Sequence, residues 1–289
     1  MVQNLNPNYK MAKCKEILGI NVDALTKSDL LSEIEHALNI RKKLFIVTMN
    51  PEGIMKAVEN SDFKNKVNTA DFVTADGIGI MWAGLFLSRK SFLSFVRFIT
   101  IPLGAFFSLL GILLWPPAIR RVFPERVSGS DLFWDILKIC DQKKKKVYLL
   151  GGGKGVAQKV KEKIEKKKIK IEIIGTYAGS PQEEGLVEKI NKKNPDILFV
   201  AWGQPKQEKF LAENLTKLNS LINIGVGGTF DFASGKRIRA PKLMQLAGLE
   251  WFWRLFLEPK RMGRIFVAVP KFVYAVVRYK IRNPYGSKN

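Results

Sequence analysis

The sequence feature that most restricts the fold is an alternation between short apolar runs and longer stretches with helical periodicity. The runs are rich in Ile, Val and Leu, and they predict strands at 44–48, 72–75, 147–150, 170–175, 197–201 and 221–226. Amphipathic stretches at 52–60, 153–167, 181–192 and 206–218 predict helices between them. Apolar strands separated by helices are typical of a parallel sheet that is covered on both faces. We therefore predict an α/β chain with a Rossmann-like parallel sheet and helices on both faces.

Several of the predicted strands end in small or polar residues. Thr48 and Asn50 close the first strand, Asp76 follows the second, and Gly151 follows the third. In doubly wound sheets the carboxyl ends of the strands border the ligand crevice. We expect the functional site at this edge of the sheet.

A segment from about residue 86 to residue 123 interrupts the alternation. It contains 22 consecutive uncharged residues, 98–119, which is long enough to cross a bilayer. A single crossing would separate the early strands from the later ones, and one parallel sheet cannot form across a membrane. Basic residues flank both ends, which favours two ends on the same side. We predict an apolar helical insert that forms a re-entrant or interfacial hairpin; a buried or oligomer-forming helical pair and a true crossing are the alternatives.

The segment from residue 236 onward is strongly basic. It holds 13 Lys and Arg against two acids, a surplus of 11 in a chain whose formal net charge is +22. Aromatic residues such as Trp251, Phe252 and Phe266 are interleaved with the cations. This mixture is typical of a helix that lies on anionic lipid, and no nucleic-acid-binding signature accompanies it. We predict a basic helical appendage at 236–289 beside an α/β domain at 13–235, with an anionic membrane surface and no nucleic acid as partner.

The remaining composition points to the cytoplasm and away from metal chemistry. Cys14 and Cys140 are isolated in sequence, which fits a reducing compartment, and the first 40 residues lack a signal peptide. His36 is the single histidine, which disfavours a His-based zinc site and a Ser-His-Asp triad. The sequence also contains no Asp-x-Asp pair. We therefore predict no metal site and no cofactor.

A glycine run at 151–155 follows a predicted strand and opens a predicted helix. Glycines at such a junction let backbone amides approach a phosphate. The spacing matches neither G-x-x-x-x-G-K-[ST] nor G-x-G-x-x-G, so a plain tight turn is an equally good interpretation. Gly151 and Gly152 are kept as candidate phosphate-binding residues.

Asp76 stands in an Ala-Asp-Gly sequence at a strand end. A carboxylate there could act as a general base on a hydroxyl, and the alternative is an N-cap for the next helix. Arg126 and Gln207 are candidates for stabilising negative charge on a leaving group without metal. A solvated surface position is the alternative for each of the two.

Three arginines near the end of the chain have helical spacing. Arg254, Arg261 and Arg264 would lie on one face of a single helix, where they could hold a diphosphate. Pro259 interrupts the stretch and weakens this prediction. The alternative is a solvated or lipid-facing basic stripe.

Six motifs occur in a fixed order along the chain. They are Thr-Met-Asn-Pro-Glu at 48–52, Ala-Asp-Gly-Ile-Gly at 75–79, Arg-Val-Ser-Gly-Ser-Asp at 126–131, Gly-Gln-Pro-Lys-Gln-Glu at 203–208, Gly-Val-Gly-Gly-Thr-Phe-Asp at 225–231 and the stretch 250–264. Together they resemble the WecG/TagA/CpsF glycosyltransferase family (glycosyltransferase family 26). The resemblance runs from about residue 17 to residue 264.

This resemblance implies an inverting, metal-independent enzyme that moves N-acetylmannosamine or a related sugar. The donor would be a UDP-sugar and the acceptor a polyprenyl-diphosphate-linked saccharide at the cytoplasmic face of the bacterial cell membrane. The family appendage need not stay docked on the core, which leaves room for a homo-oligomer. The implied roles are a catalytic base for Asp76 with Thr48 beside it; donor binding for Asn50, Arg126, Gln207, Tyr177 and Asp231; and acceptor diphosphate binding for Arg254, Arg261 and Arg264.

One departure from the family pattern is the segment 86–123. Comparable members run almost directly from the Ala-Asp-Gly motif into the Arg-Val motif, so we expect this segment to hold the enzyme at the membrane and guide the lipid chain. The competing interpretation of the whole chain is a non-catalytic basic scaffold that binds membranes or nucleic acid. The sequence does not determine which sugar is transferred.

Overall fold

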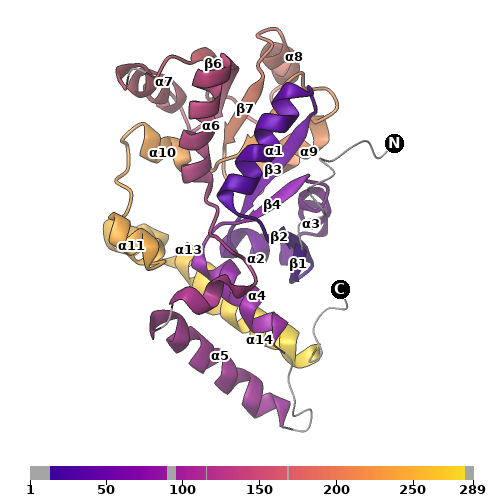
Figure 1. The fold of residues 1–289 in the computed structure, drawn as a ribbon, viewed down its shortest axis with the longest axis vertical. Helices are drawn as coiled ribbons and strands as arrows, with labels where there is room; N and C mark the ends of the chain where they lie inside the picture. Colours follow the sequence, from indigo (N-terminus) through magenta and orange to yellow (C-terminus); the bar gives the residue numbers. More distant parts are fainter. Residues whose placement is uncertain (1–13, 90–95, 115, 168, 284–289) are drawn as a thin grey trace.

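The computed structural model describes residues 14–89, 96–114, 116–167 and 169–283 (Figure 1). Its centre is a six-stranded sheet in which every neighbouring pair is parallel. The strand order is β4 (Phe72–Ala75), β3 (Leu44–Met49), β8 (Ile222–Gly225), β7 (Ile197–Ala201), β5 (Lys146–Gly151) and β6 (Glu172–Tyr177). The predicted α/β fold with a parallel sheet is confirmed.

Helices cover both faces of this sheet, as the apolar strands require. One face carries α2 (Pro51–Glu59), α3 (Ser61–Val67), α4 (Ile78–Ser88), α8 (Leu186–Asn191) and α9 (Lys206–Asn214). The other carries α1 (Lys27–Asn39), α6 (Gly129–Lys143), α7 (Val156–Lys166) and α10 (Thr229–Ala233). Side chains of β3 alternate between the two cores: Phe45 and Val47 belong to the first, Leu44 and Ile46 to the second.

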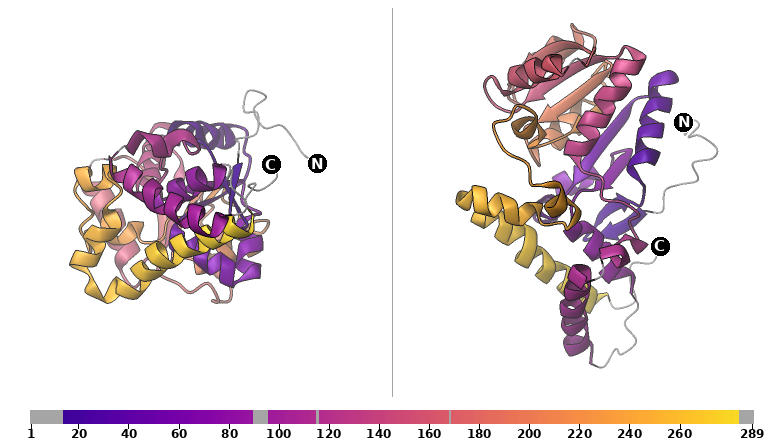
Figure 2. Two further views of the ribbon diagram at one scale, coloured as in Figure 1. Left: turned by 90° about the horizontal axis from the view of Figure 1, so that it is seen from below. Right: turned by 60° about the vertical axis from the view of Figure 1, so that its left-hand side comes forward.

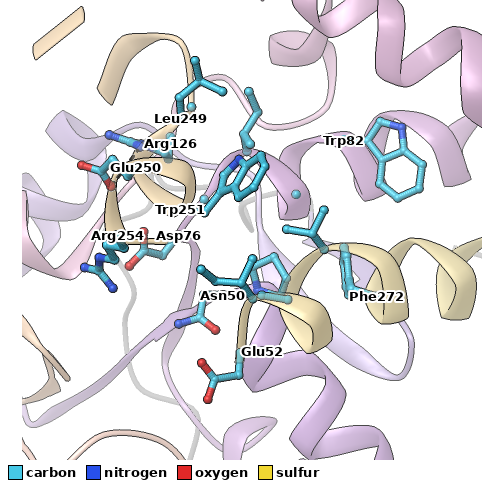
Figure 3. Close-up of a pocket in the computed structure, with 18 of the residues that line it drawn as sticks. Asn50, Glu52, Asp76, Trp82, Arg126, Leu249, Glu250, Trp251, Arg254 and Phe272 are labelled. Carbon is cyan, nitrogen blue, oxygen red and sulfur yellow. Dashed lines mark hydrogen bonds and ion pairs between the residues drawn. The ribbon is translucent and has the colours of Figure 1, made fainter. Parts of the chain in front are cut away.

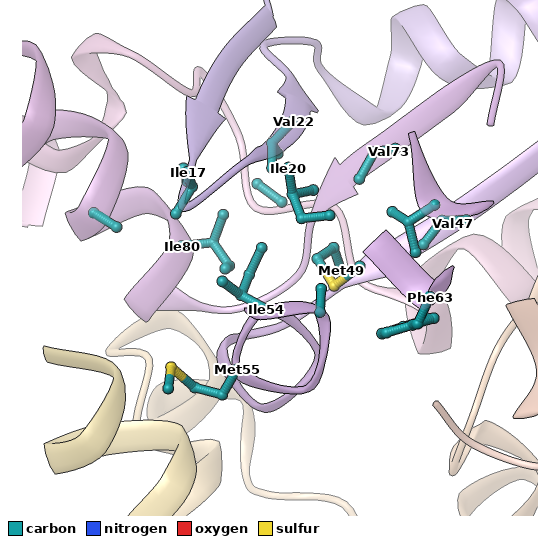
Figure 4. Packing of buried hydrophobic residues seen from close by; sticks show 14 of the residues in the cluster. Ile17, Ile20, Val22, Val47, Met49, Ile54, Met55, Phe63, Val73 and Ile80 are labelled. Atoms are coloured by element: carbon teal, nitrogen blue, oxygen red, sulfur yellow. The ribbon is translucent and has the colours of Figure 1, made fainter. Parts of the chain in front are cut away.

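A short antiparallel hairpin extends the first core. It consists of β1 (Cys14–Ile17) and β2 (Ile20–Asp23). Ile17, Ile20 and Val22 pack with residues of β4 and α4, among them Val73 and Ile80 (Figure 4). The sequence patterns did not predict this hairpin, because its short strands, CKEI and INVD, contain polar residues and form no continuous apolar run.

Several predicted boundaries are wrong for local reasons. The helix predicted from residue 153 begins at Val156, because Gly151, Gly152, Gly153 and Gly155 all have positive φ angles. The helix predicted at 181–192 begins at Leu186, after Gly185 in the left-handed region. The edge strand predicted at 170–175 is Glu172–Tyr177, because its pairing with β5 begins at Lys146 and Glu172.

The apolar segment after β4 forms two helices and a short turn. α4 is buried along almost its whole length, and α5 (Arg97–Leu114) packs against α4 and against α14 (Phe272–Arg282). A 3₁₀ turn, η1 (Pro116–Arg121), leads back to the sheet domain. Within the described ranges no helix is both long enough and apolar enough to cross a membrane.

The C-terminal appendage is a chain of short helices that folds back toward α4. It comprises α11 (Lys242–Leu246), α12 (Glu250–Leu257), η2 (Pro259–Arg261), α13 (Met262–Phe266), the π-helical turn η3 (Val267–Lys271) and α14. Figure 2 shows α13 and α14 running between the sheet domain and α5. α14 is fixed by Phe272 and Val276 in the first core, by the Tyr279 hydroxyl donating to Glu16, and by the Lys280 amine donating to the Phe86 carbonyl.

Candidate active site

Two adjoining cavities lie at the carboxyl ends of the strands. The polar cavity, of about 420 Å³, is bordered by the ends of β3, β5, β7 and β8. The apolar cavity, of about 390 Å³, lies between the end of β4 and the helices α4, α5 and α12–α14. Six residues line both cavities: Asn50, Glu52, Asp76, Ser130, Arg254 and Arg264.

Asp76 stands directly after β4, between the two cavities. Its backbone N–H donates to the Met49 carbonyl, and its Oδ2 accepts from the Gly129 N–H at 3.4 Å. The following Gly77 has φ +114, a conformation that turns the chain into α4. No side chain caps α4, so Asp76 does not serve as its N-cap.

Burial raises the pKa of the Asp76 carboxyl to about 6. Arg126 and Arg254 oppose this rise, and the negative charge of Glu250 adds to it. A carboxyl with this pKa is ionised at neutral pH yet basic enough to accept a proton. It therefore has the properties of a general base.

Glu250 was missed by the sequence interpretation, although it is the first residue of the sixth motif. It accepts from Arg126 Nη1 at 3.4 Å and from Arg239 Nε at 3.2 Å. Arg239 in turn holds Asp131 with two hydrogen bonds. This chain of alternating charges fixes Arg126 at the wall of the apolar cavity and joins α12 to the sheet domain.

Arg254 and Arg264 both border both cavities, but they are not on one helical face. α12 ends at Leu257, and the chain leaves the helical conformation at Glu258 (φ −135°, ψ 73°) before Pro259 starts a new turn. The prediction of a single helix through 250–264 is therefore wrong. Arg254 lies over the Phe232 ring at 4.8 Å, and burial lowers its pKa. Arg264 pairs with Glu52 through Nε and Nη2. The side chain of Arg261 lies outside the described part of the structure.

Thr48 and Asn50 border the polar cavity at the end of β3. The Thr48 hydroxyl donates to the Gly225 carbonyl at 3.1 Å, which ties β3 to β8. Asn50 caps α2, because its side-chain oxygen accepts from the Gly53 N–H at 2.8 Å. Asn50 also borders both cavities, and Figure 3 shows its side chain between those of Asp76 and Glu52.

Gln207 is buried at the start of α9 and fixes two loops of the polar cavity. Its Oε1 accepts from the Gly203 and Gly227 N–H groups at 3.0 and 3.1 Å. Its Nε2 donates to Glu208 Oε1 at 2.7 Å, which sets the orientation of the amide. Gly225 makes room for this arrangement, since a Cβ there would lie 2.5 Å from Gln207 Nε2.

Glu208 is the second residue that the sequence interpretation missed, although it closes the fourth motif. The carboxyl is fully buried, and its Oε2 has no hydrogen-bond partner among the described residues. Burial raises its pKa to about 7, against the lowering effect of the Gln207 amide. Its contact with Gln207 makes it part of the support of the polar cavity.

The glycine turn and Asp231 also contribute to the wall of the polar cavity. Gly152 and Gly153 border the cavity, whereas Gly151 lies behind them with its Cα close to Ala201. Asp231 also borders it and lies 3.4 Å from Arg237 Nε. Lys236 and Arg237 are further cations on this wall.

Tyr177 is not brought into either cavity. Its hydroxyl donates to Glu183 at 2.7 Å, and Lys189 Nζ lies 3.3 Å from the centre of its ring. The aromatic residue that borders the polar cavity here is Trp202, whose Nε1 donates to the Ala178 carbonyl. No periodic pattern in the sequence indicates Trp202, because this residue lies in a loop.

No cluster of three or more His, Cys, Asp or Glu side chains suited to a metal ion occurs among the described residues. The absence of a metal from the reaction stays a prediction.

The fold and the shared carboxylate define the class of the protein: an α/β protein with one carboxylate between a polar and an apolar cavity at the carboxyl edge of a parallel sheet. The chain belongs to the Glycosyl transferase WecG/TagA/CpsF family, whose family model matches residues 15–96 and 98–285. This confirms the resemblance, and the chain is a glycosyltransferase. The alternative of a non-catalytic scaffold is thereby set aside.

Similar curated proteins are N-acetylglucosaminyldiphosphoundecaprenol N-acetyl-beta-D-mannosaminyltransferases. The protein from Bacillus spizizenii (strain ATCC 23059 / NRRL B-14472 / W23) is 31% identical over 266 residues, which cover 90% of this chain and 91% of that protein. The protein from Bacillus subtilis (strain 168) is 30% identical, with 84% and 83% covered. The protein from Staphylococcus aureus (strain NCTC 8325 / PS 47) is 26% identical, with 92% of each covered.

Proposed function

We propose that the enzyme transfers an N-acetylmannosamine-type sugar from a UDP-sugar to a polyprenyl-diphosphate-linked saccharide, with inversion at the anomeric carbon. The observation that carries this proposal is the position of Asp76, which borders a polar and an apolar cavity at once. The names of the relatives support the sugar and the lipid-linked acceptor.

The polar cavity suits the donor. The backbone amide of Gly153, together with Lys236 and Arg237, provides a donor and positive charge for a diphosphate, whereas the Gly152 N–H already donates to the Ala201 carbonyl. Trp202 offers an aromatic surface for a uracil ring, a role that we propose in place of contact with Tyr177. Asp231 is placed to accept from the uracil or ribose.

The apolar cavity suits the acceptor. Trp82, Leu109, Trp251 and Phe272 provide apolar surface for the first isoprene units. Arg126 and Arg254 stand at the end nearest Asp76, as Figure 3 shows, and they are candidates for the acceptor diphosphate. Arg264 can join them only if it leaves its ion pair with Glu52.

In the proposed reaction Asp76 removes the proton from the acceptor hydroxyl as the oxygen attacks the anomeric carbon of the donor sugar. The bond from this carbon to the UDP oxygen breaks on the opposite face, and its electron pair leaves with UDP. Cations and backbone amides of the polar cavity stabilise the charge on the leaving diphosphate. No metal ion and no cofactor take part in this scheme.

We further propose that the enzyme works at the cytoplasmic face of the bacterial cell membrane, in the synthesis of teichoic acid or a related cell-surface polysaccharide. The basic appendage and the apolar walls of the acceptor cavity support a peripheral position on anionic lipid.

The test is a screen of purified full-length protein with UDP-sugars and a short-chain diphosphate-linked N-acetylglucosamine, with products identified by mass and anomeric configuration by NMR. We expect transfer from UDP-N-acetylmannosamine with inverted configuration, unchanged in the presence of EDTA. The absence of transfer from every UDP-sugar would overturn the proposal. Loss of transfer with EDTA and its recovery with a divalent ion would overturn the metal-independent scheme.

A further inference from the structure

The outermost helix of the molecule, α5, has an apolar outer face. It lies at the end of the structure opposite α8, with α14 between it and the sheet domain (Figures 1 and 2). Its inner face is buried at Ile101, Ala105 and Ser108, and the Ser108 hydroxyl accepts from Trp82 Nε1 at 2.8 Å. Its outer face carries the apolar stripe, which we define as Ile99, Leu103, Phe106 and Leu110.

The stripe has helical spacing and is open to solvent. Its residues follow one another at intervals of four, three and four positions. Ile99 is 71% exposed and Phe106 is 58% exposed, and the adjacent Phe98 and Phe107 are exposed to a similar degree. A contiguous apolar surface of this kind marks an interaction site, because leaving it in water is unfavourable.

A basic groove runs along one side of the stripe, between α5 and α14. Its volume is about 470 Å³, and its walls include Arg97, Phe98, Tyr274, Arg278, Ile281 and Arg282. None of the three arginines has a carboxylate partner among the described residues, and Arg97 lies over the Phe98 ring at 5.2 Å. Three like charges around an apolar floor repel one another and favour an anion in the groove.

The occupant must match both the stripe and the groove. A second copy of the chain could cover the stripe, but a two-fold contact there would bring two sets of unpaired arginines into one interface. A bilayer with anionic headgroups covers apolar side chains with its acyl region and neutralises the cations with its phosphates. Charge complementarity therefore selects the bilayer.

We propose that the apolar stripe of α5 and the basic groove form a docking surface for an anionic phospholipid bilayer, with lipid phosphate held by Arg97, Arg278 and Arg282. α5 then lies in the interfacial plane and does not cross the membrane.

This surface continues into the acceptor cavity. Leu109, the neighbour of the last stripe residue, borders the apolar cavity together with Trp82 and Phe272. A lipid chain can pass from the bilayer into the cavity along apolar side chains only. This last step rests on the proposed function, whereas the docking surface itself does not.

The test measures flotation of the full-length protein with phosphatidylcholine vesicles and with vesicles that also contain phosphatidylglycerol. The groove variant is Arg97→Gln/Arg278→Gln/Arg282→Gln, and the stripe variant is Ile99→Ser/Phe106→Ser. A matched charge control, Lys144→Gln/Lys159→Gln/Lys166→Gln, removes three exposed cations from α7 and the end of α6, far from α5. Transfer to the short-chain soluble acceptor is measured for each protein.

We expect the groove variant to bind anionic vesicles on the order of 100-fold more weakly than wild type, with the control within a few-fold. The stripe variant should lose binding to both kinds of vesicle.

Equal losses in the groove variant and the control would overturn the proposal. So would light scattering that shows a lipid-free oligomer dissociated by the stripe variant, because the occupant would then be a second copy. Soluble transfer should be unchanged throughout; its absence from wild type, with vesicle binding intact, would refute the proposed function and leave the docking surface standing.

Discussion

The polar and apolar cavities meet at Asp76, yet they are built from different parts of the chain. The polar cavity is made of loops that leave β3, β5, β7 and β8, and Gln207 ties two of these loops through their backbone amides. The apolar cavity touches the sheet at the residues that follow β3 and β4 and at the start of α6, and most of its other wall comes from α4, α5 and the appendage.

The difference lies in how each cavity is held together. Most of the polar cavity depends on hydrogen bonds within the sheet domain, and the appendage adds Arg254 and Arg264 to its wall. The apolar cavity depends on the docking of a separate segment, through ion pairs at Glu250 and Glu52 and the packing of Phe272. We therefore expect variants of the polar cavity to change donor binding, and variants of the apolar cavity to change acceptor binding.

Asp76→Asn should have the largest effect, because Asp76 belongs to both cavities. The amide cannot accept the hydroxyl proton, so we expect kcat to fall by roughly 10²–10⁴-fold. Asn keeps an oxygen for the Gly129 N–H, and the melting temperature and UDP affinity should stay near those of wild type. Retention of most of the turnover by a folded variant would contradict the role of Asp76.

Arg254→Gln should have the next largest effect. This variant tests whether a residue that borders both cavities acts on the acceptor diphosphate and on Asp76. Removal of a charged hydrogen-bond donor to a diphosphate should reduce kcat/KM by on the order of 10–100-fold. Arg254 also lowers the pKa of Asp76, so its removal should raise that pKa.

The pH profile provides a second readout for this variant. In wild type, kcat/KM should fall as the pH drops below about 6, because Asp76 becomes protonated. In Arg254→Gln the acid limb should move to higher pH. An unchanged acid limb would mean that Arg254 does not act on Asp76.

Gly225→Ala should disturb the polar cavity alone. The new methyl group would meet the Gln207 amide, which cannot move without releasing the Gly203 and Gly227 N–H groups. We expect a loss of about 1–3 kcal/mol in the free energy of unfolding and a KM increase of about 10-fold for the donor, with the acceptor KM unchanged. Gly104→Ala is the matched control, because nothing lies within 4 Å of its Cβ position. Equal effects on both KM values would break the division between the cavities.

Glu208→Gln should have the smallest effect on transfer. Its main effect should be on the pH dependence of the free energy of unfolding. The folded-state pKa of Glu208 is about 7, above its ordinary 4.5, so folding favours the protonated form and stability falls as the pH rises from 4.5 through 7. This loss is on the order of 3 kcal/mol. In the neutral Gln variant the free energy of unfolding should lack this loss, so its melting temperature should decline less than that of wild type between pH 5 and 8. Parallel declines in the two proteins would contradict the buried carboxylate.

The sheet and the polar cavity were largely predictable from sequence, because apolar runs place the strands and the residues that follow them meet at one edge. Thr48, Asp76 and Gly152 are brought together in this way. The apolar cavity was not predictable to the same degree. Arg239 and Glu250 meet through tertiary docking that no local period encodes, and the break at Glu258 overrides the helical spacing of the arginines. The Tyr177 hydroxyl donates a hydrogen bond to Glu183, away from the cavities. A pattern of apolar residues does not predict this contact either.

The late position of Phe272 and Val273 in the chain has a consequence for biosynthesis. These side chains line the apolar cavity together with Trp82, and they follow Asp76 by more than 150 residues in the chain. During translation most of the polar cavity can therefore assemble while the apolar cavity is still open. Under the proposed function, a nascent enzyme can meet its soluble donor before it is able to enclose the membrane-borne acceptor.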